Sequence, residues 1–190
     1  VATPKANPDE IATEVMNDIL GGMATSRVNM NLREDKHWSY GAYTGLVSAR
    51  GQRTFYVMTS VQTDKTSESV QEVMGELSRY VGNQPATAEE LDKVILNNTL
   101  SLTGRWETAG SVLGSISQIV QYGLPDDYFR HYAQAVATLE LPEVQRVANK
   151  LIDPNAMVWV VVGDQAQIET GLNALGYGNV ILIDADGNKL

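Results

Sequence analysis

The stretch that decides the fold runs from residue 40 to residue 62 and reads YGAYTGLVSA, RGQR and then TFYVMTSVQ. Residues 40–49 and 54–62 are rich in aromatic and β-branched side chains, which favour an extended backbone. Residues 50–53 contain a glycine and are short enough to reverse the chain. The sequence therefore predicts a β-hairpin of two antiparallel strands.

Apolar residues at helical spacing surround this hairpin on both sides. Ile11, Val15 and Ile19 form an apolar stripe behind a helix-start sequence at residues 7–10, in which Asn7 can cap and Glu10 can reach back. Further helices are predicted at residues 25–34, 66–81, 107–122, 126–137, 142–151 and 164–176, and another begins at a capping box over residues 87–90. Most of the chain is thus expected to be helical.

Two later apolar segments read as strands. Residues 157–162 form an apolar run rich in valine, which predicts a buried strand, and residues 180–183 predict a last short one. Helices, a hairpin, a long helical block and then strands indicate an α+β fold, with an antiparallel or mixed sheet covered by helices. We expect residues 1–190 to form one domain.

Composition excludes several classes of partner. The formal net charge is −9, so a duplex nucleic acid or an anionic membrane surface would be repelled. The longest apolar run is far shorter than a bilayer span requires. There is no cysteine, which excludes disulfides, thiolate nucleophiles and cysteine-type zinc sites.

The common catalytic motifs are absent from the sequence. The two histidines, His37 and His131, lie far apart and belong to no HxxH, HxxE or HExxH pattern, so a self-contained zinc site is not expected. A structural or surface role is predicted for His131. No serine lies in a GxSxG motif, and no glycine-rich segment has the spacing of a phosphate loop. Gly110 and Gly114, each followed by serine, are expected to allow close helix packing.

One segment could carry chemistry. It reads LGGMATSR at residues 20–27 and NLREDKHWSYGA at residues 31–42, and it places charged and aromatic residues between a helix and a strand. Arg33 can be explained by its place near a helix C-terminus, and Tyr40 by the preference of aromatic residues for strands. Functional residues nevertheless concentrate at such element ends, so both readings stay open.

This segment resembles the C-terminal domains of M16 (insulinase/pitrilysin-type) zinc metallopeptidases. The resemblance continues along the chain through TAEEL at residues 87–91, GRWE at 104–107, YGLPDDY at 122–128, VQRVANKLID at 144–153 and VVGD at 161–164. These motifs are individually weak, but they occur in the family's order and cover most of the chain.

The resemblance implies a LuxS/metallohydrolase-like half-domain that closes like a clamshell on a related half. That other half carries zinc on an HxxEH motif with a distal glutamate, whereas this half holds no metal. It supplies an arginine and a tyrosine, here Arg33 and Tyr40, as catalytic and substrate-binding residues, with Trp38 as a further substrate contact. This chain has His37 where the family usually has glycine. Only residues 1–6 could supply the end of the family's first strand, so a sheet edge is expected to be bare or filled by a neighbour.

Two functions fit this resemblance. In the first, the chain is the substrate-binding half of a zinc endopeptidase, inactive alone, with a peptide substrate and with its catalytic half in the same polypeptide or in another subunit. In the second, it is a non-catalytic peptide-binding or scaffold protein with the same fold. The resemblance is compatible with a bacterial periplasmic location.

Overall fold

The computed structural model describes residues 1–190 except the side chain of Thr103. In chain order its main elements are α1 (Glu10–Asn17), the π-helical turn η1 (Asp18–Gly22), α2 (Arg27–Asn29), the π-helical turn η2 (Met30–Asp35), β1 (Ser39–Leu46), β2 (Phe55–Val61), α3 (Thr66–Val81), α4 (Ala88–Ser101), α5 (Ala109–Tyr122), α6 (Tyr128–Ala137), α7 (Leu141–Leu151) and α8 (Gln165–Ala174). Short 3₁₀ turns occupy Thr63–Lys65, Leu102–Gly104 and Pro154–Ala156. The α+β class is therefore confirmed.

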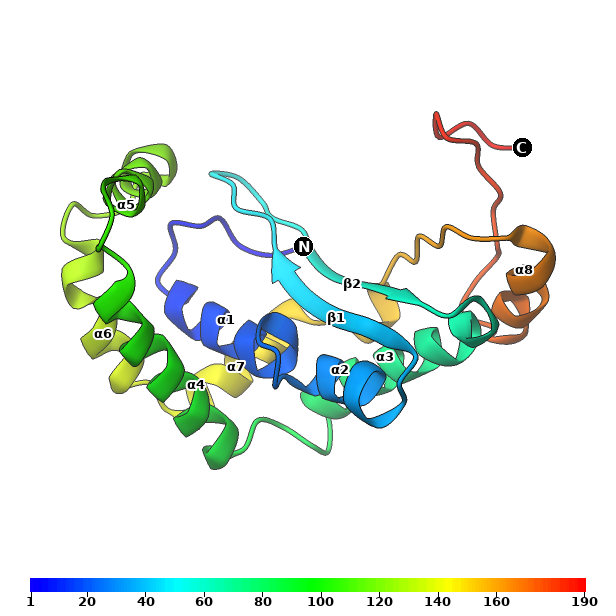
Figure 1. Ribbon diagram of the computed structural model, residues 1–190, viewed down its shortest axis with the longest axis horizontal. Helices are drawn as coiled ribbons and strands as arrows, with labels where there is room; N and C mark the ends of the chain where they lie inside the picture. The colour runs from blue at the N-terminus through cyan, green and yellow to red at the C-terminus, as the bar shows by residue number, and fades with distance from the viewer.

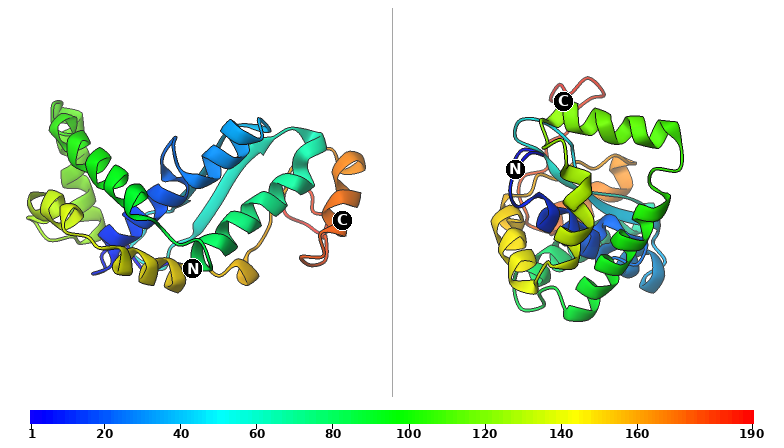
Figure 2. Two further views of the ribbon diagram at one scale, coloured as in Figure 1. Left: turned by 90° about the horizontal axis from the view of Figure 1, so that it is seen from below. Right: turned by 90° about the vertical axis from the view of Figure 1, so that its left-hand side faces the viewer.

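The molecule is elongated, with α4, α5 and α6 at one end and α8 at the other (Figures 1 and 2).

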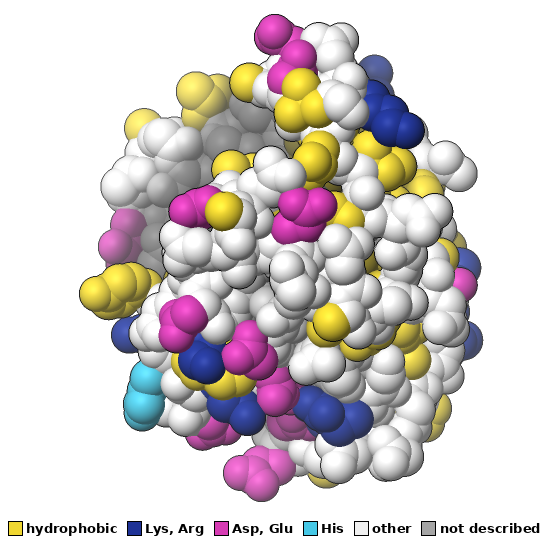
Figure 3. Space-filling model, turned by 90° about the vertical axis from the view of Figure 1, so that its right-hand side faces the viewer, with side chains coloured by type: hydrophobic (Ala, Val, Ile, Leu, Met, Phe, Trp, Pro, Cys, Tyr) yellow, Lys and Arg dark blue, Asp and Glu magenta, His cyan; other side chains and the backbone are white. Residues whose placement is uncertain are grey.

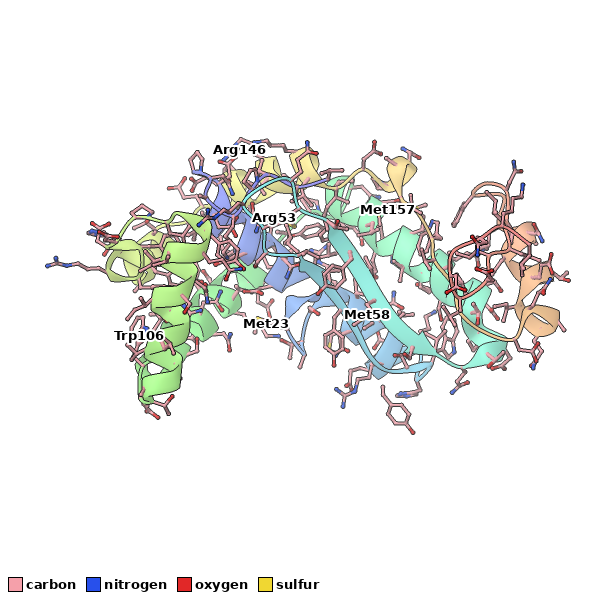
Figure 4. All side chains as sticks on the ribbon, turned by 90° about the horizontal axis from the view of Figure 1, so that it is seen from above. Met23, Arg53, Met58, Trp106, Arg146 and Met157 are labelled. Atoms are coloured by element: carbon pink, nitrogen blue, oxygen red, sulfur yellow. The ribbon has the colours of Figure 1, made fainter. Side chains whose placement is uncertain are left out.

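The predicted hairpin is present and forms the described sheet. Strands β1 and β2 pair antiparallel, with Ala42 opposite Thr59 and Leu46 opposite Phe55. The strands end earlier than expected, although the Val47 amide still donates to the Thr54 carbonyl at 3.0 Å. Viewed from above, the hairpin lies in front of the helices (Figure 4). The sheet is therefore covered by helices on one face and open on the other.

The core lies beneath the hairpin, where the amphipathic helices meet. Its fully buried side chains include Val15, Met16, Leu20, Val28, Leu32, Leu77, Tyr80 and Val144. The Tyr80 hydroxyl donates to the Met16 carbonyl at 3.2 Å, which satisfies its one polar group inside the core. The apolar faces of the predicted helices thus meet in one cluster, which packs against the helix-facing side of the hairpin.

The N-terminal segment is tied to the hairpin by a buried ion pair. Ala2 forms an isolated antiparallel bridge with Arg53, so residues 1–6 add one rung to the sheet. The Arg53 guanidinium donates to both carboxylate oxygens of Glu10, at 2.9 and 2.5 Å, and both side chains are almost fully buried. The regular helix begins at Glu10, after the predicted start at Pro8. The Asn7 side chain still accepts from the Asp9 amide at 2.9 Å and donates to the Glu10 carboxylate at 2.8 Å. The Glu10 carboxylate therefore takes part both in the local turn with Asn7 and in the tertiary ion pair with Arg53.

The prediction of a buried strand at residues 157–162 is wrong. These residues are extended and form no ladder within the described chain, and Val158, Val160 and Val162 are 86%, 77% and 95% exposed. Met157 and Trp159 do pack against the core, so the alternation expected of a strand is present over residues 157–160. Figure 3 views the end of the molecule that carries α8 and shows hydrophobic side chains on its surface. A strand needs a neighbour to pair with, and the described residues supply none here.

Two further expectations are corrected. Residues 180–183 form no strand, and Ile183 makes only an isolated bridge with Lys189. Gly110 and Gly114 allow no close helix packing, because a β-carbon added at Gly114 would meet nothing within 4 Å and one at Gly110 would come no closer than 3.9 Å to another atom. Helix α5 instead stands at the edge of the molecule, where its exposed apolar face includes Leu113 and Val120. No described helix is long and apolar enough to cross a bilayer.

Candidate functional site

Arg33 lies on the π-helical turn η2, which continues α2. Val28 and Leu32 are buried and anchor this segment in the core, so the turn is held on a rigid base. The Arg33 side chain is about half exposed (47%), and its ion pair is with the adjacent Glu34 at 3.3 Å. Exposed pairs of this kind are weak, so the guanidinium remains available to another ligand. π-Helical turns are rare and are frequent at functional sites.

The chain reverses sharply between Arg33 and the hairpin at His37. His37 has a φ of 57°, which places it in the left-handed region where glycine is favoured. One ring nitrogen of His37, Nδ1, lies 3.1 Å from the Arg33 carbonyl oxygen, and the Trp38 amide donates to the Leu32 carbonyl at 3.0 Å. This conformation gives a physical reason for the glycine that the resembling domains carry at this position. It also shows that the turn forms with histidine in place.

Trp38 is only partly available as a substrate contact. Its ring packs against the core cluster, and the ammonium groups of Lys36 and Lys65 lie 5.3 and 5.8 Å from its centroid. These cation–π contacts cover part of the ring. The structure thus gives Trp38 a packing role beside any role in binding.

Tyr40 is placed at an irregularity of the sheet. The register shifts between Ser39, which faces Val61, and Ala42, which faces Thr59, so β1 carries one extra residue in this interval. The Ala42 amide donates to the buried Asn29 side chain at 3.1 Å, which ties the irregularity to α2. β-Bulges commonly redirect side chains next to active sites. Here the side chain of Tyr40 is 99% exposed.

The structure brings the two predicted residues onto neighbouring elements, because β1 packs against η2. In the described part of the chain, no hydrogen bond or ring contact joins Arg33 to Tyr40. Each group points a free donor toward solvent. This geometry can donate hydrogen bonds to a molecule that covers the surface, and it has no nucleophile or general base of its own.

The described residues also provide no metal centre. They contain no group of three or more His, Cys, Asp or Glu side chains that could hold an ion. His131 lies on the surface, as predicted, with Nε2 3.1 Å from an Asp127 carboxylate oxygen. The zinc is expected in a partner half, and the described residues of this chain form no second metal site.

Sequence reasoning missed a polar cavity of about 540 Å³ at the other end of β1. Its lining includes Glu14, Asp18, Asn98 and Arg105, which come from α1, η1, α4 and the segment before α5. Asn98 donates to Asp18 at 2.9 Å across 80 positions of the chain. Burial raises the pKa of the Asp18 carboxyl to about 6, and the nearby Glu14 charge adds to this, against the hydrogen bond from Asn98. The only signal in the sequence was the placement of acids at every fourth position from Glu10 to Asp18.

Comparisons with known proteins agree on one family and one fold. A family model described as "Peptidase M16 inactive domain" matches residues 1–98. No curated protein matches the chain. Similar solved structures include a peptidase M16 inactive domain from Pseudomonas fluorescens, with a TM-score of 0.74 and 21% identity over 81% of this chain and 37% of that one.

Two other similar structures come from different bacteria. A protease from Helicobacter pylori has a TM-score of 0.71 and 19% identity, over 78% of this chain and 36% of that one. The periplasmic protease PqqL from Escherichia coli has a TM-score of 0.64 and 15% identity, over 78% of this chain and 16% of its own. The present chain therefore spans little more than a third of the first two proteins, and likeness at these identities concerns the fold.

Proposed function

Because this chain belongs to the peptidase M16 inactive-domain family, we propose that it is the substrate-binding, transition-state-stabilising half of a zinc-dependent endopeptidase. The zinc and the general base are supplied by a separate half that carries the HxxEH motif. Arg33 and Tyr40 are the residues of this chain that act on the peptide.

The observation that carries this proposal is the placement of Tyr40. A tyrosine side chain that is 99% exposed, at an irregularity held by a buried asparagine, buries no apolar area. Packing therefore does not explain why an aromatic residue occupies this position. A phenol held outward on a rigid strand is well suited to donate a hydrogen bond to a molecule that closes over it.

The chemistry of peptide hydrolysis uses such a donor. Attack on the scissile carbonyl builds negative charge on its oxygen, and a phenol donating to that oxygen stabilises the transition state more than the ground state. Arg33 is permanently charged and carries five donors, which suits a substrate carbonyl or carboxylate. Since both groups face solvent, the site is complete only after the two halves close, so activity depends on that movement.

A non-catalytic peptide-binding or scaffold role is the second candidate. The open face of the hairpin carries Tyr43, Tyr56 and Met58, which are 46%, 38% and 62% exposed. An exposed apolar sheet face can bind an extended peptide without any catalysis. This candidate makes Tyr40 one binding contact among several.

The test is cleavage of a quenched fluorescent peptide by this chain together with its zinc-bearing half. We expect Tyr40→Phe to lower kcat by about 10²–10³ with little change in KM, the usual cost of removing one oxyanion donor. Arg33→Lys should mainly raise KM, since the charge is kept and the fork of donors is lost. Tyr177→Phe is the matched control, because Tyr177 is also exposed but follows α8.

The outcomes separate the two candidates. Cleavage that is lost in Tyr40→Phe and kept in Tyr177→Phe supports the endopeptidase half. Equal rates for Tyr40→Phe and the unaltered chain remove the assigned role of Tyr40. Peptide binding without any cleavage by the mixture favours the scaffold.

A further inference from the structure

The polar cavity at the far end of β1 from Tyr40 has the dimensions of a ligand site. Its volume of about 540 Å³ lies within the range of roughly 300–1,000 Å³ found for small-molecule pockets. Helices α1, α4 and α6 contribute to its walls, and Leu46 of β1 lies at its edge. Arg53, labelled in Figure 4, marks the hairpin side of the cavity.

Most of the charges in the cavity neutralise one another. Glu10 accepts two hydrogen bonds from Arg53 and lies 3.0 Å from the Lys5 ammonium group. Glu14 accepts from Lys5 at 2.5 Å and from the Tyr132 hydroxyl at 3.2 Å. Two carboxylates and two cations are therefore matched, and they hold the floor of the cavity together.

One acid and one base are left over. Asp18 accepts a hydrogen bond from the neutral Asn98, and none of the ion pairs among the described residues includes it. The Arg105 guanidinium lies 5.2 and 5.5 Å from the ring centroids of Phe129 and Tyr132, and it too belongs to no ion pair in the described part of the chain. The aromatic rings of Phe129 and Tyr132 contact the planar guanidinium of Arg105, and its N–H groups remain able to donate to a ligand.

This arrangement argues against the simpler ligands. A metal ion would need several free anionic or imidazole ligands, and the described residues form no such group. A simple anion at Arg105 would leave the Asp18 carboxylate without a counter-charge. An apolar molecule would leave the charged lining without water. A ligand with one positive and one negative end matches both unpaired groups at once.

We propose that this cavity binds a small zwitterion, a free amino acid or short unblocked peptide, with its ammonium group at Asp18 and its carboxylate at Arg105. Both contacts are charge-assisted hydrogen bonds, which are stronger than bonds between neutral groups. Asp18 is partly buried and Arg105 is exposed. The proposal rests on other residues than Arg33 and Tyr40, so it stands or falls separately from the proposed peptidase function.

Isothermal titration calorimetry of the whole chain with triglycine at pH 7.5 tests this inference. We expect saturable binding of triglycine, and no binding of N-acetyl-triglycine amide, which lacks both charges. N-acetyl-triglycine and triglycine amide each lack one charge and should bind at least about tenfold more weakly. These peptides test both charges on the unaltered protein, so the result does not depend on how a variant folds.

Variants then assign each charge to a residue. Asp18→Asn should weaken triglycine amide, which carries only the ammonium group, and Arg105→Gln should weaken N-acetyl-triglycine, which carries only the carboxylate. Each loss should again be at least about tenfold. Asp92→Asn and Arg130→Gln alter exposed charges outside the cavity and should change neither affinity.

The proposal is overturned if triglycine gives no saturable binding, or if the fully blocked peptide binds as tightly as the free one. It is also overturned if Asp18→Asn and Arg105→Gln, shown by circular dichroism to be folded, bind both half-blocked peptides like the unaltered chain.

Discussion

At the scale of single residues, the Asp18 carboxyl departs strongly from the behaviour of an exposed aspartate. Its carboxyl is largely buried and receives one hydrogen bond, from Asn98. The titratable groups that share its cavity are Lys5, Glu10, Glu14, Arg53, Arg105 and Tyr132. Burial raises its pKa from 3.8 to about 6. The folded chain thus binds this proton more tightly than the unfolded chain does.

This shift makes a prediction with a definite sign. A raised carboxyl pKa lowers stability as the pH rises from about 4 to about 6, and the loss remains at higher pH. Asp18→Asn removes the buried charge and keeps a polar group near Asn98. We expect it to raise the free energy of unfolding at pH 7.5 by on the order of 2 kcal/mol, with the gain vanishing near pH 4. Urea denaturation at both pH values measures this.

Asp9 provides a control of opposite sign. Hydrogen bonds from Arg146 and Lys150 lower its pKa to about 2, and Arg146 is labelled in Figure 4 at the edge of the helices. Its contribution is present above the unfolded pKa and is lost as the pH falls toward 2. Asp9→Asn should therefore reduce stability at pH 7.5, by up to about 1 kcal/mol. A stabilising Asp9→Asn, or an Asp18→Asn effect that does not change with pH, would refute this account of the two carboxyls.

At the scale of elements, Glu90 connects a helix start to a distant helix. The predicted capping box of α4 forms, because Thr87 accepts from the Glu90 amide and the Glu90 side chain accepts from the Thr87 amide. The same carboxylate accepts two hydrogen bonds from Arg27 of α2, both at 2.6 Å. Arg27 also donates to the carbonyls of Gln84 and Pro85, and its guanidinium lies 4.9 Å from the Tyr80 ring centroid. This cluster joins α2, α3 and α4.

A double-mutant cycle with Arg27→Ala and Glu90→Gln measures this connection. Glutamine keeps the capping box and removes the charge, so the cycle isolates the ion pair. We expect a coupling free energy of about 1–2 kcal/mol, since the pair is bidentate and mostly buried. Arg33→Ala with Glu34→Gln is the matched control, where both side chains are 47% exposed and the coupling should stay below about 0.5 kcal/mol. Similar values for the two pairs would show that burial adds nothing to the first.

At the scale of the whole molecule, the two-stranded sheet leaves the extended segment at residues 157–162 without a pairing partner among the described residues. Residues 157–160 alternate between core-facing and exposed side chains, but residues 157–162 have no ladder within the described chain. Unpaired extended segments with apolar side chains are a common route to aggregation.

We predict that Val158→Lys with Val160→Lys reduces concentration-dependent aggregation, as followed by light scattering. The free energy of unfolding should change by less than about 0.5 kcal/mol, because both side chains are already largely in solvent. Trp159→Lys is the control, since Trp159 packs against the core cluster and stacks on Tyr177 with centroids 6.4 Å apart. It should destabilise the chain by roughly 2 kcal/mol or more. Strong destabilisation by the two lysines would mean that this segment is buried in solution.

Local patterns were enough to predict most of the elements. The capping box at Thr87 and the glycine that ends α5 at Tyr122 depend on residues within about one helical turn of each other. The helix over Thr66–Val81 and the hairpin depend on patterns within one continuous stretch of the sequence. The positions of Arg33 and Tyr40 came from the family resemblance. Their exposure, the π-helical turn and the sheet irregularity were not visible in the sequence.

By itself, then, the sequence determined the α+β class, the hairpin, the helix boundaries to within a few residues and the absence of a histidine-based metal motif, because these depend on near neighbours. Only the tertiary structure decided that Glu10 pairs with Arg53, that Asn98 reaches Asp18, and that residues 157–162 remain unpaired. Pairing, burial and pKa depend on groups that are tens of residues away in the chain. No local pattern encodes which of these distant groups comes into contact in the folded protein.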